Sequence, residues 1–235
     1  MIFAAKMQSV NIVSLGPGDP DQITLNSYRR LQSSDYIFCP KINGVSRAAD
    51  ILCSLSIESS KIILYDLSMD LDRSQAMSQY RDIAQEIEKL VKQDLSISVT
   101  AEGDCSIYSS TKYISDILLE REIPVESCAG IPSFLAAASL ANLHIAKLNR
   151  SLIIIPGYID YDNFKNHIIN GDSVVIMKLS RLSKDVIGKI SQMDKIELHY
   201  FENIGLPNQF YSNDREIICN RDGIYFSLLI AISLF

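Results

Sequence analysis

The sequence lacks any close pairing of cysteines. Its five cysteines are widely spaced and include no C-x-x-C pair: Cys39, Cys53, Cys105, Cys128 and Cys219. An odd number of isolated cysteines is typical of reduced thiols and argues against both a disulfide framework and a zinc site. We therefore expect a cytoplasmic protein without a metal site.

Long apolar runs and an excess of positive charge are also missing. No stretch reaches the roughly 18 apolar residues that a membrane helix needs, and the apolar part of residues 1–6 is too short for a signal peptide. The 235 residues include 22 Lys and Arg against 28 Asp and Glu, a formal net charge of −6. Nucleic-acid binding requires a basic face that neutralises phosphates. We expect neither a membrane nor a nucleic acid as partner.

Three familiar functional motifs are absent. The chain contains neither G-x-G-x-x-G nor G-x-x-x-x-G-K-[ST], which excludes the usual dinucleotide fingerprint and the P-loop. It also lacks the nucleophile elbow of the α/β-hydrolases. With 47% hydrophobic and 21% charged residues, the composition is that of a globular chain with a substantial core.

Apolar runs alternate with helical stripes through the first half of the chain, whereas the second half is richer in adjacent strands. Residues 216–219 and 225–232 resemble a hairpin around Asn220-Arg221-Asp222-Gly223. A boundary is predicted near Asn149-Arg150, which separates residues 1–149 from residues 150–235. The pattern predicts an α/β protein of two lobes with a cleft between them.

Three glycine turns each follow an apolar strand: Gly16-Pro17-Gly18-Asp19-Pro20, Gly103-Asp104-Cys105 and Gly130-Ile131-Pro132-Ser133. Glycine permits positive φ and close approach by a ligand, while Asp19 or Thr24 suits the start of a helix. A parallel sheet would bring these turns to one edge, where they offer backbone groups to a polar ligand. Taken alone, the pattern favours three unrelated structural turns over a ligand site.

The order and spacing of these turns resemble the tetrapyrrole (corrin/porphyrin) methyltransferase family over nearly the whole chain. The resemblance implies S-adenosylmethionine as methyl donor and two α/β lobes that flank a trough for cofactor and substrate. Ile37-Phe38-Cys39-Pro40-Lys41 and Tyr225-Phe226-Ser227-Leu228-Leu229-Ile230 are similar to members that methylate C20 of precorrin-2 or cobalt-factor II in cobalamin biosynthesis. A sibling such as a uroporphyrinogen-III methyltransferase, or a catalytically silent binding module, remains an alternative.

The resemblance also implies which residues bind each ligand. The cofactor residues it implies are Pro17, Glu102, Gly103, Asp104, Ile107, Pro132, Ser133, Met177, Ile204, Gly205 and Ser227. The tetrapyrrole carries eight carboxylates, so basic residues near the trough are candidate substrate contacts: Lys41, Arg47, Arg73 and Lys112. No residue is assigned as a catalytic base, and Asp104 is expected to cap its turn. The resemblance implies a homodimer.

Two positions depart from the family pattern. Cys105 stands where the second turn usually has proline, and Ala129 stands where a proline usually precedes the third glycine. Replacing proline frees φ and restores an N–H donor. We expect less rigid turns and modestly weaker cofactor binding, with activity retained.

Overall fold

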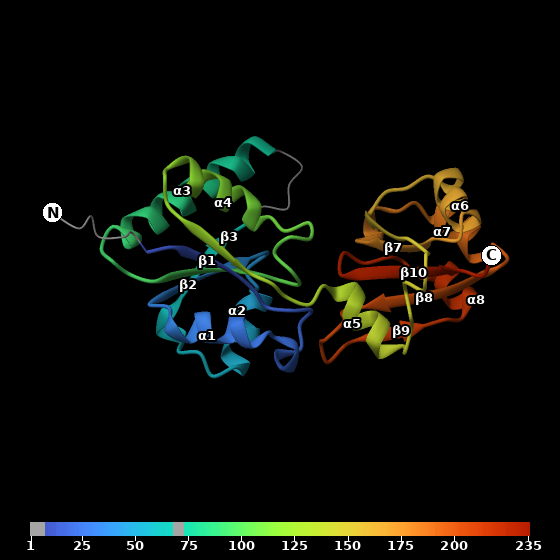
Figure 1. Ribbon diagram of the computed structural model, residues 1–235, viewed down its shortest axis with the longest axis horizontal. Helices are drawn as coiled ribbons and strands as arrows, with labels where there is room; N and C mark the ends of the chain where they lie inside the picture. The colour runs from blue at the N-terminus through green and yellow to red at the C-terminus, as the bar shows by residue number, and fades with distance from the viewer. Residues whose placement is uncertain (1–7, 68–72) are drawn as a thin grey trace. The chain divides into compact units, whose positions relative to one another are not determined.

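Two five-stranded sheets form the framework, one in each of the units Met1–Pro132 and Ser133–Phe235 of the computed structural model (Figure 1). The structure describes residues 8–67 and 73–235, except for the side chain of Arg73. Both units combine helices with a sheet, so the predicted α/β class with two lobes is confirmed.

The first unit contains an entirely parallel sheet of order β3-β2-β4-β1-β5. Its strands are β1 (Val10–Ser14), β2 (Tyr36–Lys41), β3 (Ile62–Asp66), β4 (Ile97–Ala101) and β5 (Val125–Cys128). The central strands β1 and β4 are buried along their whole length. Strands covered on both faces need apolar residues throughout, which explains why they appear in the sequence as continuous apolar runs.

Helices cover both faces of this sheet (Figure 1). They are α1 (Leu25–Ser33), α2 (Arg47–Ser54), α3 (Arg73–Val91) and α4 (Thr111–Glu120), with short 3₁₀ helices η1 (Pro20–Gln22) and η2 (Ser59–Lys61). One core joins α1 and α2 to Val13, Ile37 and Cys39, while the other joins α3 and α4 to Ile12 and Phe38. Alternate strand residues therefore feed two separate cores.

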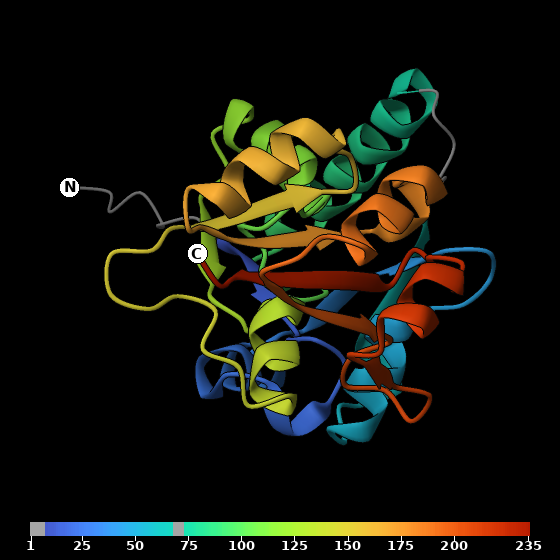
Figure 2. The ribbon, with the colours of Figure 1, turned by 90° about the vertical axis from the view of Figure 1, so that its right-hand side faces the viewer.

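The second unit contains a mixed sheet of order β6-β7-β10-β8-β9. Its strands are β6 (Leu152–Pro156), β7 (Ser173–Met177), β8 (Ile196–Glu202), β9 (Phe210–Ser212) and β10 (Ser227–Ser233). Its helices are α5 (Ser133–Leu140), α6 (Tyr161–Ile169), η3 (Leu179–Arg181), α7 (Lys184–Ser191) and α8 (Arg215–Asn220). Side chains of α6, α7 and α8 share one core with one face of the sheet. Figure 2 turns the ribbon so that the helices and strands of this unit come into view.

The hairpin predicted for residues 216–219 is wrong, because this segment belongs to helix α8. The Asp214 carboxylate accepts hydrogen bonds from the N–H groups of Glu216 and Ile217, at 2.8 and 3.3 Å, and so starts a helix. Ile218 is fully buried in the core of the second unit. The apolar run Ile217-Ile218-Cys219 suits either structure, and the cap at Asp214 decides between them.

The compact units meet in sequence at residues 132 and 133, and the first strand of the second sheet begins at Leu152. The predicted boundary at residues 149 and 150 falls between α5 and this strand. Within the described ranges, no helix combines the length and apolarity needed to cross a membrane.

Candidate functional site at the carboxyl edge of the first sheet

The first unit places its glycine turns where its parallel sheet changes winding direction. Strands β1 and β4 are neighbours, yet α1 follows β1 into one core and α4 follows β4 into the other. Ligands of open α/β sheets bind outside the carboxyl ends of strands at such a switch point. Since β5 is the other neighbour of β1, all three turns lie at this edge, as the sequence analysis predicted.

The first two turns are bonded to each other through their backbones. The Gly16 N–H donates to the Gly103 carbonyl at 3.1 Å, and the Gly103 N–H donates to the Gly16 carbonyl at 2.7 Å. Both glycines have positive φ, +77° for Gly16 and +72° for Gly103, which explains why glycine is favoured at each. Of the two caps predicted for the first helix, Thr24 caps α1, while the Asp19 side chain caps the separate short helix η1.

Asp104 joins the second turn to the third. Its carboxylate accepts hydrogen bonds from the Gly130 N–H at 2.6 Å and from the Ser106 N–H at 2.8 Å, and the Ser106 hydroxyl also donates to it. Burial raises the pKa of Asp104, but these hydrogen bonds outweigh it and leave the pKa below its ordinary value. Asp104 is therefore an ionised structural group, in agreement with its predicted capping role.

Ser14, the last residue of β1, contacts the second and third turns. Its Oγ accepts a hydrogen bond from the Cys105 N–H at 2.9 Å. A Cβ added to Gly130 would lie 2.4 Å from the Ser14 Cβ and 2.5 Å from the Gly103 carbonyl oxygen, so only glycine fits there. A proline at position 105 would have no N–H for Ser14. The N–H of Cys105, which a proline would lack, thus bonds the second turn to the end of β1.

The remaining cofactor candidates of the first unit lie around the same edge. Pro17 is buried within the first turn, and Ile107 donates its N–H to the Asp104 carbonyl at 3.1 Å. On the side of Gly103 where a Cβ would project, the nearest atom is the Pro132 Cα at 4.0 Å. The Gly103 backbone is accordingly open to approach by a ligand, and the residues present fit a cofactor bound through backbone groups.

Three of the four basic candidates have acidic partners. Lys41, at the end of β2, lies 3.2 Å from Asp66, and Arg47, at the start of α2, lies 3.4 Å from Glu102. Burial raises the pKa of Glu102, an effect that Arg47 partly offsets. Lys112 pairs with Asp116 one turn further along α4. Arg73 begins α3, and its side chain lies outside the described part of the chain.

The other cofactor candidates belong to the second unit. Ser133 opens α5, while the rest lie at neighbouring strand ends, since β10 pairs with both β7 and β8. Met177 pairs in register with Leu228, next to Ser227, and Ser227 pairs with Glu202. The loop after β8 carries buried Ile204 and then Gly205, whose φ is +80°. The second unit therefore brings together four predicted residues, Met177, Ile204, Gly205 and Ser227.

Comparison with known proteins identifies the family. The sequence model for Tetrapyrrole (Corrin/Porphyrin) Methylases matches residues 9–213, most of the chain. The chain belongs to this family.

Curated tetrapyrrole methylases with similar sequences include three with related names. The probable cobalt-precorrin-2 C(20)-methyltransferase of Methanocaldococcus jannaschii is 28% identical over 176 residues, 73% of either chain. The cobalt-precorrin-2 C(20)-methyltransferase of Salmonella typhimurium is 25% identical, with 71% of each chain covered. The precorrin-2 C(20)-methyltransferase of Sinorhizobium sp is 24% identical, with 72% of each covered.

Solved tetrapyrrole methylases share the fold. A cobalt precorrin-4 methyltransferase superposes with a TM-score of 0.73 at 14% identity, covering 95% of this chain and 94% of the other. The uroporphyrin-III C-methyltransferase of Thermus thermophilus, complexed with S-adenosylhomocysteine, gives a TM-score of 0.62 at 15% identity, covering 97% and 98%. At these identities the likeness concerns the fold alone.

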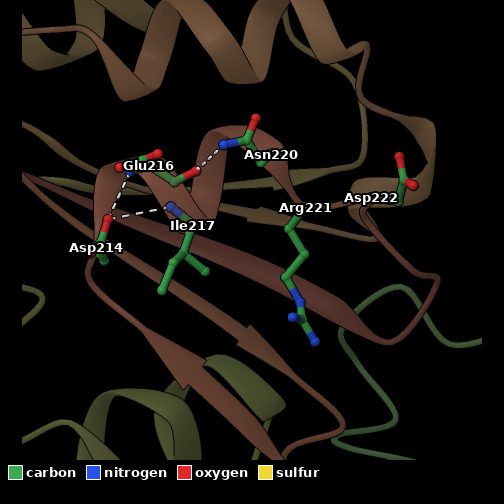
Figure 3. A pocket seen from close by; sticks show the side chains of 6 residues that line it. All are labelled: Asp214, Glu216, Ile217, Asn220, Arg221 and Asp222. Carbon is green, nitrogen blue, oxygen red and sulfur yellow. Dashed lines mark hydrogen bonds between the residues drawn. The ribbon is translucent and has the colours of Figure 1, made fainter.

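One open pocket of this tetrapyrrole methylase lies at α8 in the second unit and is lined by none of the candidate residues. Its volume is about 470 Å³, and it is lined by Asp214, Glu216, Ile217, Asn220, Arg221 and Asp222 (Figure 3). Three of the four charged groups have partners, because Asp214 caps α8, Arg221 pairs with Glu202 and Asp222 pairs with Lys184. Most of the charged groups at this pocket are therefore engaged within the protein.

Ser14 and a buried cluster around Glu202 were not predicted from the sequence. Ser14 is the polar residue at the end of β1, and that position was its only signal in the sequence. Glu202 accepts hydrogen bonds from Tyr200 and from Arg221, nineteen residues further along the chain. A pair so far apart in sequence as Glu202 and Arg221 cannot be predicted from local spacing.

Proposed function

We propose that the chain is an S-adenosylmethionine-dependent C-methyltransferase that methylates C20 of precorrin-2 or cobalt-factor II in cobalamin biosynthesis. The observation that carries the proposal is the joining of three glycine turns at the switch point of the first sheet, in a chain of the tetrapyrrole methylase family. The names of three relatives, which share 24–28% identity over most of their length, support carbon 20 as the methylated position.

The cofactor supplies a methyl group already activated on a sulfonium sulfur. The protein's residues then need to hold donor and acceptor in near-attack geometry and to exclude water, without a strong nucleophile of their own. In the first unit we assign cofactor binding to Pro17, Glu102, Gly103, Asp104, Ile107 and Pro132. In the second unit we assign it to Ser133, Met177, Ile204, Gly205 and Ser227, where Met177 and Ile204 supply apolar contacts.

We assign recognition of the substrate's carboxylates to Lys41, Arg47, Arg73 and Lys112. In the described ion pairs, Lys41, Arg47 and Lys112 each lie beside a carboxylate before substrate arrives. A carboxylate of the substrate would compete with Asp66, Glu102 or Asp116 for the same cation. This arrangement lets an acidic protein bind a polyanion through a few local contacts.

The test is to incubate the protein with methyl-labelled S-adenosylmethionine and precorrin-2, with and without cobalt, and to locate the label by NMR. We expect one labelled methyl group on C20. Whether the reaction with cobalt or the one without it gives this product defines the metal state of the acceptor. A parallel reaction uses uroporphyrinogen III. Label on another carbon, or turnover of uroporphyrinogen III alone, would favour a sibling activity. Binding without turnover would favour a silent module.

We further propose a cytoplasmic homodimer. The five cysteines, all free thiols, support a reducing compartment. The dimer rests on the family resemblance, and light scattering coupled to size-exclusion chromatography tests it. A mass of 26.3 kDa in solution would identify a monomer.

A further inference from the structure

We propose that Arg221, Glu202 and Tyr200 form a positioning cluster that holds the cofactor-binding strand ends of the second unit in their working arrangement. The inference rests on the proposed function, because that proposal assigns Ile204, Gly205 and Ser227 to the cofactor. It adds three residues that touch neither reactant and act through the backbone next to them.

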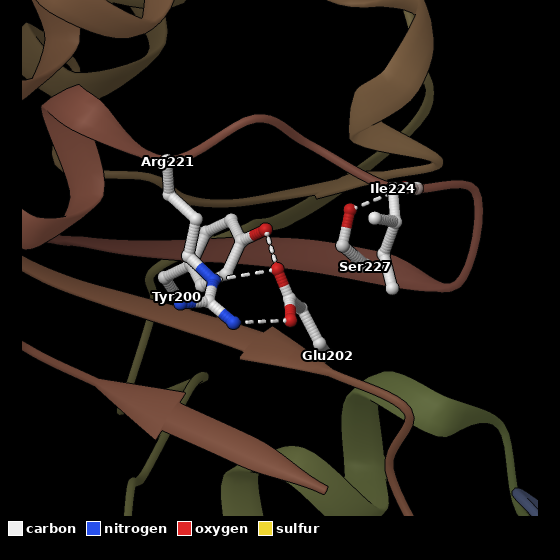
Figure 4. Close-up of polar contacts among 5 residues, drawn as sticks. All are labelled: Tyr200, Glu202, Arg221, Ile224 and Ser227. Carbon is white, nitrogen blue, oxygen red and sulfur yellow. Dashed lines mark hydrogen bonds and ion pairs between the residues drawn. The ribbon is translucent and has the colours of Figure 1, made fainter. Parts of the chain in front are cut away.

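In this cluster, both oxygens of the Glu202 carboxylate accept hydrogen bonds (Figure 4). Arg221 donates from Nε to Oε1 of Glu202 and from Nη2 to Oε2, each at 2.7 Å, and the Tyr200 hydroxyl donates to Oε1 at 2.5 Å. The Glu202 side chain is only 8% exposed. The guanidinium carbon of Arg221 lies 3.7 Å from the ring centroid of Phe210. One cation therefore ties together the end of β8, the strand β9 and the segment after α8.

Glu202 and Arg221 each begin a segment that carries cofactor candidates. Glu202 is the last residue of β8, and the following loop turns through Asn203, with φ of +49°, to Ile204 and Gly205. The Asn203 N–H donates to the Phe226 carbonyl at 2.9 Å. Holding Glu202 thus holds the start of the loop that presents Ile204 and Gly205.

Arg221 begins the second segment, residues 221–227, which ends at Ser227. The Ser227 hydroxyl donates to the Ile224 carbonyl at 2.5 Å, and its own carbonyl accepts from the Lys178 N–H at 2.9 Å. A Cβ on Gly223 would lie 2.8 Å from the Leu179 carbonyl carbon, so this segment runs tightly over the chain that follows β7. The segment is pinned at Arg221, Gly223 and Ser227.

The pairing of β10 with β8 and β7 connects the loop after Glu202 to residues 221–227. Ser227 pairs directly with Glu202, and the adjacent Leu228 pairs with Met177. A displacement of Glu202 therefore reaches Ser227 as its neighbour across the ladder. The Glu202 side chain is buried, whereas that of Arg221 is 36% exposed, so the pair adds little net stability and the geometry it specifies is the stronger reason for having it here.

The principal variant for testing this is Arg221→Lys, which keeps the charge but cannot form the two-point bond. We expect its dissociation constant for S-adenosylmethionine, measured by calorimetry, to rise about tenfold, equivalent to the loss of about 1.4 kcal/mol of binding. The KM for the tetrapyrrole should change less than twofold. Tyr200→Phe removes one of the three bonds and should give a smaller rise than Arg221→Lys.

Ile168→Ala is the matched control for lost stability. Ile168 is fully buried, and its carbonyl accepts from the Ser233 hydroxyl at the opposite end of β10. This variant should lower the melting temperature without changing cofactor affinity. Unchanged affinity in Arg221→Lys, or an equal rise in Ile168→Ala, overturns the inference.

The wild-type protein separates this inference from the proposed function. If the wild type binds the cofactor but transfers no methyl group, the proposed function fails, and the affinities of the variants still decide the inference. If the wild type does not bind S-adenosylmethionine, both fail. A raised dissociation constant in Arg221→Lys at a melting temperature near that of the wild type supports a positioning role.

Discussion

Asp104 is the residue on which the geometry of the second and third turns depends. Its carboxylate accepts backbone hydrogen bonds from Gly130 and Ser106 and a third from the Ser106 hydroxyl. Only the ionised form accepts all of these without a competing proton. Hydrogen bonds to a charged group contribute about 1.5–3 kcal/mol each before the cost of burial is subtracted. The net benefit therefore depends on pH.

The Asp104→Asn variant tests this dependence. Because folding lowers the pKa of Asp104, its contribution to stability is fully present above the unfolded value, about 3.9, and is lost as pH falls through the lower folded value. We expect the variant to lose about 1–3 kcal/mol of unfolding free energy at pH 7. Urea unfolding should show this loss shrinking below pH about 4.

Asp116→Asn serves as the control for removal of a charge. Asp116 is an exposed residue of α4 whose pair with Lys112 lies on the surface. Such pairs contribute about 0.3–0.5 kcal/mol. A difference between wild type and Asp104→Asn that stays constant from pH 7 to the acid limb would contradict the structural role of the charge.

At the scale of elements, Gly130 sets how closely the third turn approaches β1. A Cβ at this position would meet Ser14 and the Gly103 carbonyl well inside contact distance. Gly130→Ala should destabilise the protein by at least about 1–3 kcal/mol, as overpacking does. Since the displaced atoms belong to the proposed cofactor edge, affinity for S-adenosylmethionine should also fall. Thermal unfolding and calorimetry measure the two effects.

Gly188→Ala is the matched glycine control in helix α7. Its added Cβ would lie 3.9 Å from the Cys219 Sγ, an ordinary contact. Alanine in a helix is favoured over glycine by up to about 1 kcal/mol, so this variant should be neutral or stabilising. Normal cofactor affinity in Gly130→Ala would show that the close approach at Gly130 is not needed for binding.

The sequence predicts elements where local chemistry decides them. Gly16, Gly103 and Gly130 were placed correctly because glycine turns after apolar strands have a local signature, and a parallel sheet then gathers them at one edge. Helix α8 was missed because three apolar residues in a row suit a strand equally well. The Asp214 side chain decides for a helix by accepting hydrogen bonds from its first N–H groups.

Contacts between distant parts of the chain leave no such signature. Arg221 was interpreted as a turn residue, whereas it forms a two-point bond with Glu202 and packs on Phe210. Cys105 was predicted to loosen its turn by restoring an N–H donor, and the acceptor of that N–H, Ser14, lies 91 positions away in sequence and was not predicted. Both depend on the strand order, which spacing along the chain does not encode.

At the scale of the whole molecule, the two units have separate sheets and separate cores. Within the second unit, Ser133–Phe235, Arg150 lies just before the first strand, β6. Its guanidinium donates to the carbonyl of Ser233 and, at 2.6 Å, to that of Phe235, so the chain entering β6 is bonded to the chain leaving β10. The predicted boundary at residues 149 and 150 would therefore place this closing contact within the second unit.

Hydrogen exchange of an Arg150→Ala variant tests whether the second unit opens independently. Losing a charged hydrogen bond of about 1.5–3 kcal/mol should raise exchange of β6 and β10 amides by about tenfold or more, while β1 and β4 exchange as in wild type. Arg30→Ala, which breaks an exposed pair with Glu126 in the first unit, should leave both sheets unchanged. An equal rise in β1 and β10 after Arg150→Ala would mean that the two units unfold as one cooperative structure, since a local contact in one would then stabilise both.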